Sequence, residues 1–118
     1  MPDMADAQDP SKALSALGRY AGPATLILSS LAGGEKHGYA LTRDVETFAG
    51  VRLAPGTLYE ALGRLEAQGL IEALPPQDRR RPYRLTAVGA AVLGEHLADQ
   101  RRVVEVGLER LSGSGVIA

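Results

Sequence analysis

The strongest chemical feature of this 118-residue sequence is a cluster of arginines beyond its midpoint. Four of the eleven arginines fall within six positions, at Arg79, Arg80, Arg81 and Arg84, whereas the formal net charge of the chain is only −1. A guanidinium carries a planar fork of donors that matches phosphate, and it keeps its charge at any physiological pH. The cluster therefore predicts a local anion-binding site. The alternative is a charged loop that contacts only solvent.

Other reactive groups are sparse. The chain has no Cys, which excludes disulfides, a thiolate nucleophile, an iron–sulfur cluster and a Cys-type zinc site. Its only two histidines, His37 and His96, are far apart in sequence. No Ser–His–acid set, carboxylate pair or glycine-rich phosphate loop stands out. We therefore expect no enzyme activity, no metal site and no cofactor.

The composition is that of one small domain. Hydrophobic residues make up 45% of the chain, enough for a single compact core. No apolar run approaches the roughly 20 residues of a membrane span. The first ten residues carry three Asp and no basic residue, unlike a signal peptide. We expect a soluble cytoplasmic protein without a membrane partner.

Three amphipathic helices are predicted before the arginines. The first begins at Pro23, a favourable first helical residue, and ends at Gly33. Its apolar residues have the i, i+3, i+4, i+7 spacing of one helix face: Ala24, Ile27, Leu28 and Leu31. The second covers about 38–48, with an apolar face made of Leu41, Val45 and Phe48. The third begins at Pro55 and ends at Gly69.

The third helix has a polar side and leads into a hairpin. When residues turn by about 100° each, Thr57, Glu60 and Arg64 face away from the apolar side. Residues 70–74 (LIEAL) and 82–85 (PYRL) predict two short strands, and the loop PPQDRRR joins them. Three helices followed by a hairpin with a basic tip indicate a helix-turn-helix with a wing.

A long helix is predicted after the hairpin. Thr86 can cap it, and it covers about 87–111, roughly 37 Å at 1.5 Å per residue. A helix this long extends beyond a small core, so part of its apolar stripe needs a second chain. The predicted dimer interface comprises Leu14, Leu17, Leu93, Leu97, Val104, Leu108 and Leu111.

The predicted fold class is mainly α with a small β-hairpin. We expect a disordered tail over 1–10 and a winged helix-turn-helix DNA-binding domain over 11–86, which includes an N-terminal helix. A C-terminal dimerisation helix over 87–111 and a flexible tail over 112–118 complete the chain.

Three sequence blocks occur together between about residues 24 and 95. They are HGYAL (37–41), LAPGTLYEALGRLEAQGLIEA (53–73) and RRPYRLTAVG (80–89). In this order and spacing they resemble the PadR family of winged-helix transcriptional regulators, and the single long C-terminal helix resembles the family's smaller subgroup. The resemblance implies a homodimer that binds an inverted-repeat operator, usually as a repressor and often released by a small molecule.

The chain departs from the family pattern at three places. Ala54 replaces a common Ser before PGT, so the third helix loses a side-chain cap worth about 1 kcal/mol. Glu60 stands where Pro is usual, and its carboxylate either accepts from a cytosine N4 amine or weakens phosphate contact. Ala87 and Val88 replace acidic residues.

The predicted DNA-binding residues lie on the third helix and the wing. A major groove about 12 Å wide admits one helix with small or polar side chains on its first turns. The helix contributes Pro55, Gly56, Thr57, Tyr59, Glu60 and Arg64, and the wing contributes Arg79, Arg80, Arg81 and Arg84. Further candidates are Lys36, Tyr39 and Arg52. Core packing is the alternative role of both tyrosines. We expect His37 to start a helix and His96 to lie on the surface.

The sequence therefore predicts a sequence-specific DNA-binding transcriptional regulator whose partners are an operator in double-stranded DNA and a second copy of the chain. The alternative is a winged-helix adaptor that binds protein, but an adaptor has no use for four clustered arginines. Residues 87–111 contain no aromatic side chain, so a stacking pocket for a planar effector is not expected. An aliphatic effector pocket and no effector at all remain open.

Overall fold

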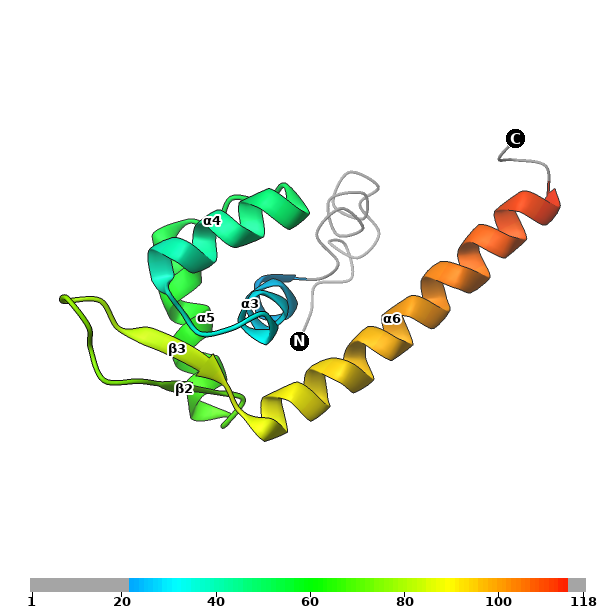
Figure 1. The fold of residues 1–118 in the computed structure, drawn as a ribbon. Coiled ribbons are helices and arrows are strands. Elements are labelled where there is room, and N and C mark those ends of the chain that lie inside the picture. The colour runs from blue at the N-terminus through cyan, green and yellow to red at the C-terminus, as the bar shows by residue number, and fades with distance from the viewer. Residues whose placement is uncertain (1–21, 115–118) are drawn as a thin grey trace, which may run out of the picture.

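The structure is a computed structural model that describes residues 22–114 (Figure 1). In this range the order of elements is α3 (Gly22–Ala32), β1 (Lys36–His37), α4 (Gly38–Ala49), α5 (Pro55–Ala67), β2 (Ile71–Ala73), β3 (Pro82–Leu85) and α6 (Ala87–Ser114). This is the mainly helical winged-helix fold with a small antiparallel sheet that the sequence predicts. The predicted segments 1–10 and 11–20, with Leu14 and Leu17, lie outside the described residues.

Helix α3 lies at the centre of the domain and contacts α4, α5, α6 and β3. Ile27, Leu28 and Leu31 are buried as predicted, but Ala24 is exposed. Ser30 is buried instead, and its hydroxyl donates to Asp44 Oδ2 on α4 at 2.6 Å. The core comprises Ile27, Leu28, Leu31, Leu41, Val45, Leu53, Leu58, Leu62, Leu65, Ile71 and Leu93.

Helices α4 and α5 form the helix-turn-helix. Helix α4 ends at Gly50, whose φ of 67° lies in the left-handed region and whose N–H donates to Glu46 O. Phe48, predicted on the buried face of α4, is 50% exposed, so that face ends one turn earlier than expected. Helix α5 begins at Pro55, and Ala54 provides no side-chain cap, as its replacement of Ser predicts.

The sheet has three antiparallel strands in the order β1–β3–β2. The two wing strands were predicted from the sequence, whereas β1 was not. In β1, Lys36 pairs with Tyr83 and His37 with Pro82, so the start of α4 is attached to the wing. Two residues are too few to show a strand periodicity.

Thr86 joins the sheet to α6. Its Oγ1 accepts from Gly89 N at 2.9 Å, which confirms the predicted cap, and donates to Gly69 O at 2.7 Å. Helix α6 continues to Ser114, three residues beyond the predicted end. It leaves the domain at one corner and extends away from it (Figure 1).

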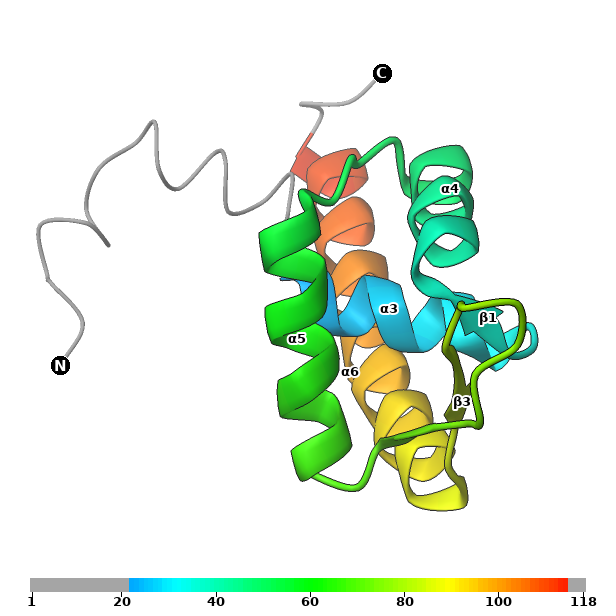
Figure 2. The same cartoon turned by 90° about the vertical axis from the view of Figure 1, so that its left-hand side faces the viewer.

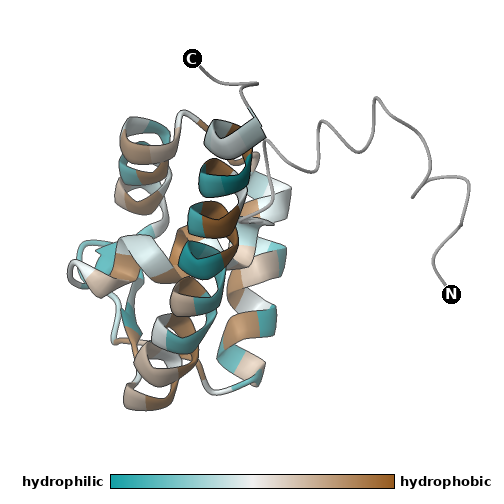
Figure 3. Ribbon diagram, turned by 90° about the vertical axis from the view of Figure 1, so that its right-hand side faces the viewer, coloured by the Kyte–Doolittle hydropathy of each residue, from teal (hydrophilic) through white to brown (hydrophobic). Residues whose placement is uncertain are grey.

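Only the first part of α6 packs on the domain. Leu93, predicted in the dimer interface, is 5% exposed and belongs to the protomer's own core, so that assignment is wrong. It lies on the part of α6 that packs on the domain, where α6 contacts α3. Beyond Gln100 every described residue is exposed, and Figure 3 shows hydrophobic residues along this length. No helix within residues 22–114 combines the length and apolar character of a membrane span.

Candidate nucleic-acid interface

One side of the domain brings α5, α4 and the tip of the wing together (Figure 2). The buried residues Leu58, Leu62 and Leu65 fix one face of α5 against the core. The opposite face carries Thr57, Glu60 and Arg64, all exposed as the 100° periodicity predicts. At the start of α5, the space around Gly56 is open. The helix therefore offers a free polar strip and an open N-terminus, the features that bind a groove and a phosphate.

Glu60 and Arg64 are not independent on this strip. Arg64 Nη2 donates to Glu60 Oε1 at 2.9 Å, one turn apart on the same helix. Both side chains are mostly exposed, with relative accessibilities of 65% for Arg64 and 72% for Glu60. The sequence predicts both positions, and the structure adds the pairing.

The two tyrosines lie at the surface and not in the core. Tyr59 is 58% exposed, and its hydroxyl would lie 2.8 Å from a Cβ added at Gly38. Tyr39 is 63% exposed, and its hydroxyl accepts from Arg43 Nη1 at 3.1 Å. The Arg43 guanidinium also lies 5.9 Å from the centre of the Tyr39 ring, a cation–π distance. Sequence reasoning missed Arg43, although its i+4 spacing from Tyr39 places it on the same face.

The tip of the wing is a tight two-residue turn. Gln77 N donates to Arg80 O at 2.7 Å, and Arg80 N donates to Gln77 O at 2.8 Å. Between them, Asp78 and Arg79 have φ values of 50° and 65°, the positive values of a type I′ hairpin turn. The turn therefore holds the first arginines of the cluster at the end of the hairpin.

The four wing arginines have different surroundings. Arg84 lies opposite Glu72 in the strand register, and its guanidinium donates to that carboxylate. Arg80 Nη1 lies 3.3 Å from His37 Nε2. Arg79 and Arg81 are exposed and have no hydrogen-bonded or ion-paired partner among residues 22–114. These two are therefore the most available for an external anion, whereas Arg84 supports the hairpin.

Lys36 and His37 make contacts within the domain, whereas Arg52 lies on its surface. Lys36 Nζ donates to Ser30 O at 2.5 Å and to Gly34 O at 3.3 Å, which closes the end of α3. His37 Nδ1 accepts from Ala40 N at 3.3 Å, so His37 is the predicted start of α4. Arg52 is exposed, and its Nη2 lies 3.7 Å from Glu46 Oε1. For Lys36 to contact DNA, its Nζ must release the carbonyl oxygens of Ser30 and Gly34.

Comparison with known proteins identifies the family of this winged-helix domain. Residues 27–95, more than half of the chain, match the family described as transcriptional regulator PadR-like. The chain belongs to the PadR family. The family resemblance seen in the sequence is therefore confirmed, and membership implies DNA-binding regulation. The family is one of transcriptional regulators.

The chain matches two curated relatives over different shares of their length. The chain is 41% identical over 90 residues to the transcriptional regulator Rv3488 of Mycobacterium tuberculosis, spanning 74% of this chain and 80% of the relative. It is 47% identical over 78 residues to an uncharacterised 37.1 kDa protein in transposon TN4556 of Streptomyces fradiae. That match spans 66% of this chain but only 23% of the relative.

Two solved PadR-family structures have the same fold. The regulator from Eggerthella lenta is 31% identical, with a TM-score of 0.68, and the match covers 92% of this chain and 96% of that one. A regulator from hypervirulent Clostridium difficile is 28% identical, also with a TM-score of 0.68, covering 75% of this chain and 97% of that one.

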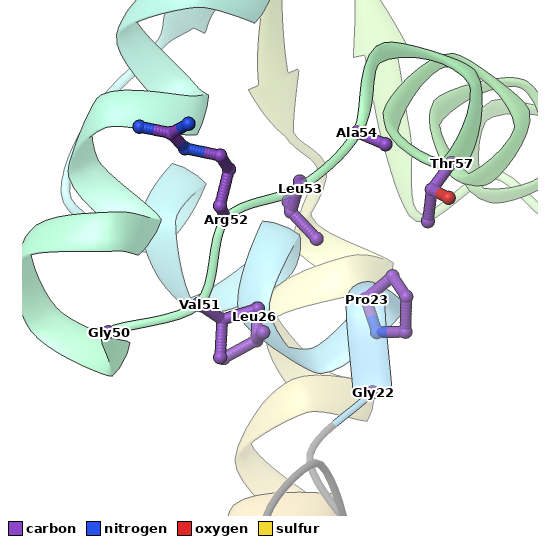
Figure 4. A pocket seen from close by; sticks show the side chains of 9 residues that line it. All are labelled: Gly22, Pro23, Leu26, Gly50, Val51, Arg52, Leu53, Ala54 and Thr57. Atoms are coloured by element: carbon purple, nitrogen blue, oxygen red, sulfur yellow. The ribbon is translucent and has the colours of Figure 1, made fainter.

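A hollow of about 410 Å³ lies beside the start of α5 in this PadR-family domain (Figure 4). It is bordered by the start of α3 and the α4–α5 connection, with Gly22, Pro23, Leu26, Gly50, Val51, Arg52, Leu53, Ala54 and Thr57 around it. Arg52 points away from its centre (Figure 4). Its wall is mainly aliphatic. Residues 22–114 contain no cluster of three or more side chains suited to hold a metal ion.

Proposed function

We propose that this PadR-family regulator is a repressor that binds an inverted-repeat DNA operator as a homodimer. The observation that carries the proposal is that α5, whose exposed face is polar, and the tip of the wing, which carries the arginines, lie on the same side of the domain (Figure 2). A helix with an exposed polar face suits the major groove, and arginines beside it suit phosphates or the minor groove.

The two parts of the interface have different tasks in this proposal. Thr57, Glu60 and Arg64 read base edges, while the open N-terminus at Pro55 and Gly56 approaches a phosphate. The wing tip supplies sequence-independent attraction through Arg79, Arg80 and Arg81. The proposed contacts to the DNA backbone are the exposed residues Tyr39, Arg43, Arg52 and Tyr59.

Dimerisation rests on the free part of α6. Leu97, Val104, Leu108 and Leu111 are 40–55% exposed although they are large and apolar. They recur at spacings of 7, 4 and 3 residues, which places them on one helix face. A second copy that covers this stripe gives the two-fold axis that an inverted repeat requires.

A small molecule that releases the repressor would fit the hollow shown in Figure 4. Its aliphatic wall favours an apolar ligand without a planar stacking group. Because Ala54 and Thr57 border the hollow, a ligand there would move the start of α5.

The substitution Leu26→Trp would fill the hollow with a larger side chain. We expect this variant to keep operator binding and to lose release by any such inducer.

The wing tests the proposal directly. Each arginine on a phosphate releases counterions, so affinity falls with salt at a slope near −0.9 per contact. We expect the triple change of Arg79, Arg80 and Arg81 to Ala to weaken operator and random DNA alike and to flatten the slope by about 2 to 3. The measurement is a gel shift at several salt concentrations on the DNA upstream of the protein's own coding region.

The control replaces two arginines of α6 that lie outside the apolar stripe, Arg102 and Arg110, by Ala and should leave the salt slope unchanged. An unchanged slope in the wing variant would show that the cluster contacts only solvent. Failure of the unaltered protein to bind any DNA at low salt would instead favour the protein-binding adaptor.

A further inference from the structure

We propose that Glu60 and Arg64 act as one unit that reads a single G·C base pair, in one orientation, in each half of the operator. The inference rests on the proposed function, because it requires α5 to enter the major groove. It goes further by stating which base pair the strip of α5 selects and why one residue alone does not select it.

The geometry of the pair comes first. Arg64 Nη2 donates to Glu60 Oε1 at 2.9 Å, and both side chains are mostly exposed. The buried leucines on the opposite face hold the helix backbone in place. The two charged ends therefore meet on the exposed face of α5, where their remaining donors and acceptor have no other hydrogen-bond partner among residues 22–114.

The order of these groups is the second step. A guanidinium that keeps one N–H on Glu60 still offers other donors, and the carboxylate still offers acceptor lone pairs. Side by side, the Arg64 guanidinium presents two N–H donors and the Glu60 carboxylate presents an acceptor next to them. The major-groove edge of a G·C pair presents guanine N7 and O6, both acceptors, followed by the donor N4 of cytosine. The order donor, donor, acceptor on the protein therefore complements the order acceptor, acceptor, donor on the G·C pair.

Other base pairs do not match this row. An A·T pair presents an acceptor, a donor, an acceptor and then the thymine methyl group, so one arginine donor meets another donor or the methyl. A G·C pair in the reverse orientation places the cytosine amine against the guanidinium. The unit therefore distinguishes G·C from the other three arrangements, whereas a lone Arg64 could bind any exposed acceptor or phosphate.

Charge supports the same conclusion. Arg64 neutralises Glu60, so this part of α5 attracts the phosphate backbone little, in contrast to the wing tip. An unpaired carboxylate in the groove would face phosphate repulsion. The pair thus confines Arg64 to base recognition and leaves sequence-independent affinity to the wing.

The experiment is a binding selection from randomised duplex DNA with the full-length protein and its variants Glu60→Ala and Arg64→Ala. Both positions are exposed, so both variants should fold, which circular dichroism checks. The control is Asp99→Ala, which breaks the i, i+3 pair of Arg102 and Asp99 on α6, joined at 3.6 Å and away from the apolar stripe.

We expect the unaltered protein and the control to select G·C at one fixed position of each half-site. Both variants should lose discrimination at that same position, by about 5- to 100-fold, and the double variant should lose little more. All other positions of the motif should stay as selective as before.

Two results would overturn the inference while leaving DNA binding intact. In the first, Glu60→Ala strengthens binding to all sequences and leaves the selected motif unchanged, so that Glu60 only repels phosphate. In the second, the two variants relax different base pairs, so that each residue reads alone. Failure of the unaltered protein to select any motif would overturn the proposed function itself.

Discussion

Arg79 occupies a backbone conformation that most side chains disfavour. Its φ of 65° lies in the left-handed region, where glycine is the usual residue of a hairpin turn. For a residue with a Cβ, this conformation costs on the order of 1 kcal/mol. A cation at this position is consistent with a gain in anion binding that offsets the strain.

Arg79→Gly separates these two effects. We expect the free energy of unfolding to stay level or to rise by about 1 kcal/mol, because the turn loses its strain. DNA affinity should fall, and its salt slope should flatten by about 0.9. Urea denaturation and gel shifts over a range of salt check the two parts, and Arg79→Lys, which keeps the charge, should retain the slope.

Tyr83 predicts a dependence of stability on alkaline pH. Partial burial raises the pKa of its phenol above 10.0, the carboxylate of Glu66 raises it further, and Arg81 acts in the opposite direction. Because the folded pKa exceeds the unfolded one, the folded state retains the proton longer. The stability that Tyr83 contributes is therefore complete below pH 10 and is lost as pH rises through the folded pKa.

Replacing Tyr83 by Phe should remove this contribution. Urea unfolding of the unaltered protein between pH 9 and pH 11 should show a steeper loss of stability than unfolding of the variant. Parallel curves would contradict the role of this phenol.

At the scale of elements, local sequence signals predicted the helix boundaries, because these depend on neighbouring residues in the chain. Proline at a first helical position, glycine after a last one and the Thr86 cap identify the helices to within a few residues. Strand β1 escaped prediction because its two residues form a strand only by pairing with β3. Burial of Leu93 likewise depends on where α6 contacts α3, and the spacing of apolar residues along α6 does not predict that position.

The candidate site divides in the same way. The 100° periodicity of α5 predicts which side chains face outward, and the composition of the loop predicts a basic wing. The partners of these side chains depend on strand register and helix packing. The pairing of Arg84 with Glu72 and the use of Lys36 to close α3 therefore appear only in the structure.

Gly89 allows the first turn of α6 to pack closely on Leu70 and Leu85. A Cβ added there would lie 2.0 Å from Leu70 O and 2.9 Å from Leu85 Cδ1. We expect Gly89→Ala to lower the free energy of unfolding by about 3 kcal/mol or more, because backbone atoms must move. Gly94, one turn and a half later, has open space around it, so Gly94→Ala should raise stability by up to about 1 kcal/mol. Thermal unfolding compares the two, and equal effects would contradict this account of the junction.

At the scale of the whole molecule, one DNA-reading helix cannot by itself specify an operator. It covers a few base pairs, which cannot distinguish an operator from the competing sites of a genome. Two such helices about 34 Å apart along the duplex can do so if a two-fold axis relates them. Helix α6 extends away from the interface and carries an exposed apolar stripe, so it is the element that can place two domains at a fixed spacing (Figures 1 and 3).

The stripe and the opposite face of α6 offer a matched test of the homodimer. Burial of about four Leu and Val side chains per subunit, at about 25 cal/mol per Å² of apolar surface, gives several kcal/mol before the association costs. Leu97→Glu with Val104→Glu places two charges in the stripe and should give monomers that no longer bind the operator, although the DNA-facing residues are unchanged. Val88→Glu with Val106→Glu adds the same charge to exposed valines about 180° to 200° around the helix and should leave the dimer intact. Light scattering at micromolar concentration measures both, and a mass near the 12.4 kDa of one chain for the unaltered protein would refute the dimer.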